Sequence, residues 1–151
     1  MLKRSALGIA LLVSLLLVAT AAPAHAATGL RRLYRGETSQ GERISFVVAR
    51  TDAGRFVREI RLSTVLTCED QTTQVFGIDF FLVRRDAPIT DGAFSFDRNL
   101  GDLAVHVAGE LGSLQGQGTA SMVAATLTSD EQAQLCMTGD LTWTVEFVRK
   151  L

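Results

Sequence analysis

Apolar and polar residues alternate strictly over residues 141–147 of this 151-residue chain. Leu141, Trp143, Val145 and Phe147 occupy one set of positions, and threonine or glutamate fills the positions between them. A period of two is typical of a β-strand with one buried face. Tryptophan, threonine, valine and phenylalanine also suit a pleated, half-buried surface. This stretch therefore predicts a strand that presents Trp143 to the core.

Comparable stretches recur along the chain, separated by short turn segments. The strands we expect are residues 30–35, 44–49, 56–68, 75–83, 94–96, 103–111, 118–127 and 141–147. Only residues 128–131 have the Thr and Glu spacing of a helix-capping box, so one short helical turn is expected there. Without long helical crossovers the strands cannot form a parallel sheet. The sequence thus predicts an all-β, antiparallel β-sandwich of about eight strands, with a jelly roll among the arrangements that fit.

The first 26 residues have the organisation of an export signal. Two basic residues precede an apolar run, and a Pro-Ala-His-Ala sequence supplies the small residues that a signal peptidase accepts. We expect cleavage between Ala26 and Ala27, which separates a signal peptide, residues 1–26, from one domain, residues 27–151. An uncleaved anchor is the alternative, but polar residues, a glycine and a proline interrupt the run before the about 20 apolar residues of a spanning helix.

The charge of the mature chain excludes one class of partner. Cleavage removes two of the 15 basic residues, which leaves 13 basic and 16 acidic residues and a net charge of −3. Nucleic-acid-binding domains carry a basic patch and a basic net charge, so no nucleic acid is expected. The signal predicts a secreted, extracellular or cell-wall-associated protein, without membrane contact once the signal is removed.

The chain has only two cysteines, Cys68 and Cys136, and each lies at an end of an expected strand. Cys68 shares its parity with Leu62 and Leu66, so it faces the core as a buried disulfide requires. Exported chains with two cysteines usually join them. We therefore predict one Cys68–Cys136 disulfide. A two-sheet sandwich fits this link better than an up-and-down barrel, because one disulfide can tie two sheets across a core. Two buried free thiols are the alternative.

The residues that could hold a metal are few and widely spaced. His106 shares one strand face with Asp102 and Glu110, but strand positions four apart are roughly 13 Å apart. A zinc site needs three or four ligands. Residues 97–102 weakly resemble a calcium loop, and a hairpin turn explains the same residues. We expect no metal and no cofactor.

No catalytic residues can be assigned from the sequence. No expected strand carries the paired carboxylates of a glycoside hydrolase, and no Gly-x-Ser-x-Gly elbow is present. The glycine-rich residues 112–118 lack the lysine and the helix of a phosphate loop. A non-enzymatic protein that binds a partner is therefore expected. A secreted hydrolase with a site assembled from distant strands, and a small-ligand or carbohydrate-binding module, are the alternatives.

The expected strand at residues 75–83 is apolar on both faces. Phe76, Ile78, Phe80 and Leu82 form one face, and Val75, Phe81 and Val83 interrupt the other. A large exposed apolar patch on a monomer marks a contact site. We expect Val75, Phe81 and Val83 to contact a protein or cell-envelope partner, unless a loop or residues 128–135 cover them.

Four sequence features together resemble a known family. They are Gly36-x-Thr-Ser-Gln-Gly41-x-x-Ile-Ser-Phe46-x-Val, the mid-chain Cys68, Asp91-Gly-Ala-Phe-Ser-Phe96, and Cys136-x-Thr-Gly139-x-x-x-Trp143. The chain resembles the small exported two-cysteine β-sandwich proteins of actinobacteria over nearly all of its mature length. The resemblance implies export and a β-sandwich, and it implies no catalytic residues.

Overall fold

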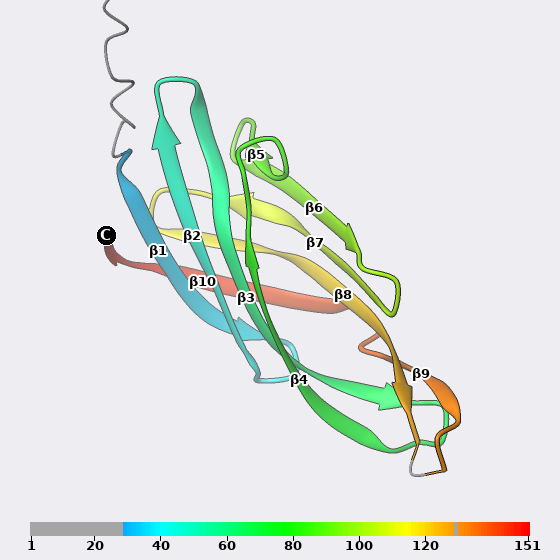
Figure 1. The fold of residues 1–151 in the computed structure, drawn as a ribbon. Helices are drawn as coiled ribbons and strands as arrows, with labels where there is room; N and C mark the ends of the chain where they lie inside the picture. The colour runs from blue at the N-terminus through cyan, green and yellow to red at the C-terminus, as the bar shows by residue number, and fades with distance from the viewer. Residues whose placement is uncertain (1–28, 129) are drawn as a thin grey trace, which may run out of the picture.

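The structure is a computed structural model that describes residues 29–128 and 130–151. The expected signal peptide and its cleavage site at Ala26 and Ala27 therefore lie outside the described residues. The described part of the chain is built from strands and turns, without a helix (Figure 1). Its strands are β1 (Arg31–Thr38), β2 (Arg43–Thr51), β3 (Gly54–Cys68), β4 (Thr73–Phe81), β5 (Pro88–Ile89), β6 (Ala93–Asn99), β7 (Leu103–Leu111), β8 (Gln115–Leu127), β9 (Ala133–Met137) and β10 (Leu141–Lys150).

All the strand pairings are antiparallel, so the predicted all-β, antiparallel class is confirmed. The ten strands belong to one sheet with the order β10-β1-β2-β3-β9-β8-β7-β6, and β4 and β5 pair with β3 beside this path. Because β10 pairs with β8 as well as with β1, the pairings close a ring through β1, β2, β3, β9, β8 and β10. The two layers belong to one sheet that folds over on itself, so a sandwich of two separate sheets is not confirmed (Figure 1).

Aromatic side chains fill the space between the two layers. The centre of the Phe46 ring on β2 lies 4.8 Å from the ring centre of Trp143 on β10 and 5.5 Å from that of Phe94 on β6. Trp143 is 1% exposed, as its alternation with polar residues predicted, and its indole Nε1 donates a hydrogen bond to the backbone oxygen of Thr119. A Cβ atom at Gly118 would lie 2.5 Å from the Trp143 ring. Glycine at this position of β8 therefore makes the space that the indole occupies.

The predicted disulfide is confirmed. Cys68 of β3 and Cys136 of β9 are paired residues of adjacent strands, with Cα atoms 3.8 Å apart, and both are buried. The bond lies where β9 joins the two layers, because β9 pairs with β3 on one edge and with β8 on the other. It therefore links neighbouring strands where the ring closes, whereas the sequence had suggested a link across the core.

Two expectations from the sequence differ from the structure. The helical turn expected at residues 128–131 is wrong for the part described: the Thr128 N–H donates to the backbone oxygen of Gln132 and Glu131 has φ 59°, as in a loop joining β8 to β9. The register of these strands pairs Leu127 with Ala133, which leaves too few residues for a helix. The described residues form ten strands where about eight were expected. The sequence did not reveal β5 and β9, because strands of two and five residues are too short to show an alternating pattern.

Candidate functional site

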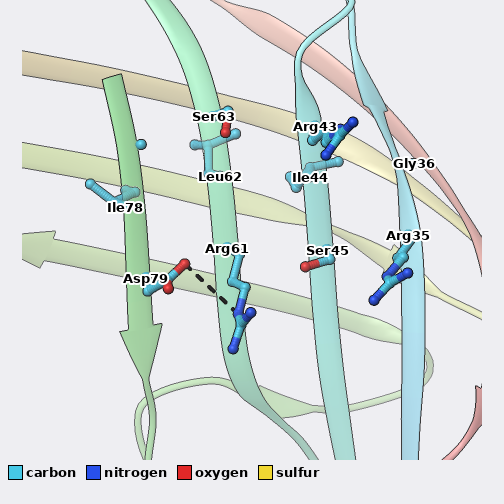
Figure 2. A pocket seen from close by; sticks show the side chains of 11 residues that line it. Arg35, Gly36, Arg43, Ile44, Ser45, Arg61, Leu62, Ser63, Ile78 and Asp79 are labelled. Atoms are coloured by element: carbon cyan, nitrogen blue, oxygen red, sulfur yellow. Dashed lines mark ion pairs between the residues drawn. The ribbon is translucent and has the colours of Figure 1, made fainter. Parts of the chain in front are cut away.

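A shallow groove of about 850 Å³ crosses the outer face of β1, β2, β3 and β4. Its main row of side chains follows the strand register, since Arg35 pairs with Ser45, Ser45 with Arg61, and Arg61 with Asp79. Figure 2 shows these four side chains in a line across the four strands. The groove therefore combines residues that lie far apart in the sequence.

A second set of residues lines the groove one step along the strands. Arg43 pairs with Glu37 of β1 and is the diagonal neighbour of Arg35, and Ser63 pairs with Gly77. A Cβ atom on Gly77 would have no heavy atom nearer than 3.9 Å. The missing side chain at Gly77 therefore leaves open space beside the hydroxyl group of Ser63.

The charges in the groove are only partly compensated. Arg61 donates hydrogen bonds to Glu59 at 2.6 and 3.1 Å and lies 3.8 Å from Asp79. The hydrogen bond and charge of Glu59, followed by the charge of Asp79, raise the pKa of Arg61 above its ordinary value. The ion pairs within 4.0 Å among the described residues do not include Arg35 or Arg43. The register sets Glu146 opposite Arg35 and Glu37 opposite Arg43, but neither carboxylate lies within 4.0 Å of the guanidinium group.

The apolar residues expected to contact a partner are uncovered. Val75, Phe81 and Val83 are 74%, 72% and 51% exposed. Val75 and Phe81 lie on β4, on the same face as the groove residue Asp79, and neither a loop nor residues 128–135 bury them. Their role as a partner contact remains a prediction. On the outer face of β4, Val75 and Phe81 form an exposed apolar margin beside the polar groove.

His106 contacts a carboxylate that the sequence did not indicate. Its Nδ1 lies 2.6 Å from Oδ1 of Asp97 on β6, whereas spacing along the chain indicates only Asp102 and Glu110 as neighbours. The register of β6, β7 and β8 sets Asp97, His106 and Ser121 in one row beside a hollow of about 400 Å³. This partner could not be found from spacing along the chain, because it depends on which strands are neighbours.

The Asp97–His106–Ser121 row lacks two parts of a serine hydrolase. Among the described residues no hydrogen bond joins His106 to Ser121, so the hydroxyl is not activated by the imidazole. The strand β7 pairs with β6 on one edge and β8 on the other, which occupies the backbone N–H groups that an oxyanion hole would need. This row orients an imidazole and provides no developed site for acyl transfer.

Metal ligation has equally little support in the described part of the chain. No group of three or more His, Cys, Asp or Glu residues is placed to hold a metal ion within residues 29–128 and 130–151. In the turn of residues 97–102 the Asn99 Oδ1 accepts a hydrogen bond from the Gly101 N–H, and Gly101 has φ +79°. These residues form the hairpin turn between β6 and β7.

Comparison of the chain with protein-family models, with curated proteins and with solved structures gave no match. Within the described residues, no helix has the length and apolar character needed to cross a membrane. The Cys68–Cys136 disulfide is consistent with an oxidising, extracellular environment. Two features are thus left from which a function can be proposed: the groove on β1–β4, with Arg35 and Arg43, and the exposed apolar residues of β4.

Proposed function

We propose that the mature chain is an exported, non-enzymatic binding protein that holds an anionic group of a cell-envelope or extracellular partner in the β1–β4 groove. The observation that carries this proposal is the pair Arg35 and Arg43, which line the groove without an ion pair to a described carboxylate. Guanidinium groups bind carboxylate, sulfate and phosphate through two parallel hydrogen bonds.

The spacing of the two arginines suits one shared anion. Diagonal neighbours on adjacent antiparallel strands have Cα atoms about 7–8 Å apart, a separation that two long side chains can close around a ligand. Ser45 lies on β2 beside Arg43 and Ser63 lies on β3, and the hydroxyl groups of both can donate further hydrogen bonds. The groove volume is also within the about 300–1,000 Å³ typical of ligand sites.

The charge of the whole chain favours a localised interaction. The mature chain carries 13 basic and 16 acidic residues, so its net charge does not by itself attract an anion. Attraction is confined to the groove, where Arg35 and Arg43 lie close together. We therefore expect binding of an acidic group at one site, with an affinity that falls as salt screens the exposed charges.

Titration of the mature chain with dextran sulfate and with neutral dextran tests this proposal. Dextran sulfate should bind and neutral dextran should not, and replacement of both arginines, Arg35→Gln with Arg43→Gln, should weaken binding by about tenfold or more. A charge-assisted hydrogen bond contributes about 1.5–3 kcal/mol, and 1.4 kcal/mol corresponds to tenfold in affinity.

Arg50→Gln is the matched control for the groove variants. Arg50 is exposed on β2, the same strand as Arg43, and lies seven residues away, roughly 23 Å along the strand. Its replacement removes one positive charge outside the groove and should leave the affinity unchanged. An equal loss of affinity in Arg50→Gln, or equal binding of both dextrans, would contradict the proposal.

A further inference from the structure

Within residues 29–128 and 130–151, β4 pairs only with β3, so its other edge has no partner strand there. The Leu82 N–H donates to the backbone oxygen of Arg58, and the Cys68 N–H donates to that of Thr72. Each bond joins the two residues one step beyond an end of the β3–β4 register, which runs from Glu59 opposite Phe81 to Thr67 opposite Thr73. In an antiparallel pair the backbone groups of alternate residues point to opposite edges. The even-numbered residues of β4 therefore bond to β3, and the N–H and C=O groups that point away belong to Thr73, Val75, Gly77, Asp79 and Phe81.

The hydrogen bonds of the loop after β4 support this assignment and show where the unpartnered edge ends. Val83, the next odd-numbered residue, donates its N–H to Oδ2 of Asp86 and accepts a hydrogen bond from the Asp86 N–H. Its backbone groups therefore also point away from β3, and the loop has already occupied them. The unpartnered edge thus ends at Phe81.

This edge lacks the features by which proteins usually prevent strand addition. Its nine residues include no proline, lysine or arginine, and Asp79 is the single charge. Val75 and Phe81 present exposed apolar side chains beside the unpartnered backbone groups. The strand β6, which ends the main path of the sheet, is shorter, carries Asp97 and Arg98, and has its Ala93 backbone bonded to Thr90. Strand addition is therefore favoured at β4.

We propose that a second copy of the chain adds its own β4 to this edge, antiparallel and related by a two-fold axis at Ile78. In this register Val75 lies opposite Phe81 of the second copy, and Gly77 lies opposite Asp79 of the second copy. Each such pair exchanges two backbone hydrogen bonds, because both residues direct their groups to the interface. The contact is isologous, as expected for a dimer of identical chains.

Side-chain chemistry selects this register from its neighbours. Centring the axis on Ile78 places the two exposed apolar residues against each other twice, and a cross-strand aromatic–valine pair is favourable. It also places the Asp79 carboxylate of one copy opposite Gly77 of the other copy. In that other copy Gly77 pairs with Ser63, which lines the groove on β1–β4. Centring on Gly77 would oppose Asp79 to Val75, and centring on Asp79 would oppose two carboxylates.

The molar mass of the mature chain, measured by sedimentation over a concentration series, tests the dimer. Val75→Pro removes an N–H that points to the unpartnered edge and no hydrogen bond to β3, a change that edge strands tolerate. This variant should be monomeric. Ser95→Pro makes the matching change on β6, whose Ser95 also points its N–H away from β7, and it should remain dimeric.

Phe81→Asp gives a second measurement at a side chain that is largely exposed. It should also abolish the dimer, with a melting temperature within a few degrees of that of the monomeric Val75→Pro variant. A wild-type chain that stays monomeric up to about 1 mM, where an interaction of about −4 kcal/mol would be visible, overturns the proposal. A dimer that persists in both β4 variants overturns it as well.

Engineered cysteines test the register itself. Opposed residues of a hydrogen-bonded pair have Cα atoms about 5.5 Å apart, which is within the 4.4–6.8 Å range of a disulfide. Under oxidising conditions the double variant Val75→Cys with Phe81→Cys should give a covalent dimer linked between positions 75 and 81. Gly77→Cys alone should not link, and a dimer linked through position 77 overturns the register centred on Ile78.

Discussion

At the scale of single residues, two glycines give Trp143 its position. A Cβ atom on Gly118 would lie 2.1 Å from the backbone oxygen of Ala108 and 2.5 Å from the Trp143 ring, and one on Gly109 would lie equally close to that ring. The two glycines are paired in the β7–β8 register, so both strands lie against the indole with bare backbone. A side chain at either glycine would occupy the space that the Trp143 ring fills.

Gly118→Ala should destabilise the fold because neither contact can relax without moving a strand. Overpacking of a well-filled core costs typically about 1–3 kcal/mol. The loss should appear as a lower urea midpoint with an unchanged slope. Gly77→Ala is the matched control, since its added methyl group meets no atom within 3.9 Å. Similar midpoints for the two variants would show that the space around Gly118 can accept a methyl group and contradict this prediction.

At the scale of elements, β9 owes its position to pairings at both of its edges and to the disulfide. It has five residues, and only two residue pairs join it to β3. Such a short contact fixes little by itself, because closing a long loop is entropically costly. The Cys68–Cys136 bond joins positions 68 residues apart and holds β9 where the two layers meet.

Replacement of both cysteines, Cys68→Ser with Cys136→Ser, should lower the free energy of unfolding by roughly 4 kcal/mol. The chain-entropy account gives this value for a loop of about this length, because the crosslink restricts the unfolded chain. Denaturant titration of the oxidised wild type and the double variant measures it. A difference below about 1 kcal/mol would show that the β8–β9 pairings alone suffice to hold β9.

At the scale of the whole molecule, the buried disulfide and the expected signal peptide point to the same compartment. Disulfides persist in oxidising environments outside the cytosol. The sequence before Ala27 has the charged start, apolar run and small residues that a signal peptidase requires. Export and disulfide formation would thus precede any binding by the groove.

The secreted product should have the intact mass of residues 27–151, reduced by two hydrogens for the disulfide. Cleavage after Ala26 removes the apolar run and both basic residues that precede it. Intact-mass spectrometry of the protein recovered outside the cell measures this, with a reduced sample as its control. A product that retains residues 1–26 would contradict cleavage and favour a membrane anchor.

The sequence by itself determined the eight longer strands, the buried side of the clearly alternating ones, and the disulfide, but not β5 and β9. These follow from local alternation: successive side chains of a strand point to opposite faces, so parity alone assigns Trp143 and Cys68 to the core. The apolar second face of residues 75–83 was likewise readable, and the exposure of Val75 and Phe81 agrees with it.

Only the tertiary structure decided which strands are neighbours and in what register. The groove depends on Arg35, Arg61 and Asp79 meeting in one row, and the contact of His106 depends on Asp97 of another strand. Alternation is a property of each strand alone, whereas register arises from hydrogen bonds and packing between segments distant in the chain. For the same reason the unpartnered edge of β4 becomes visible only when the rest of the sheet is in place.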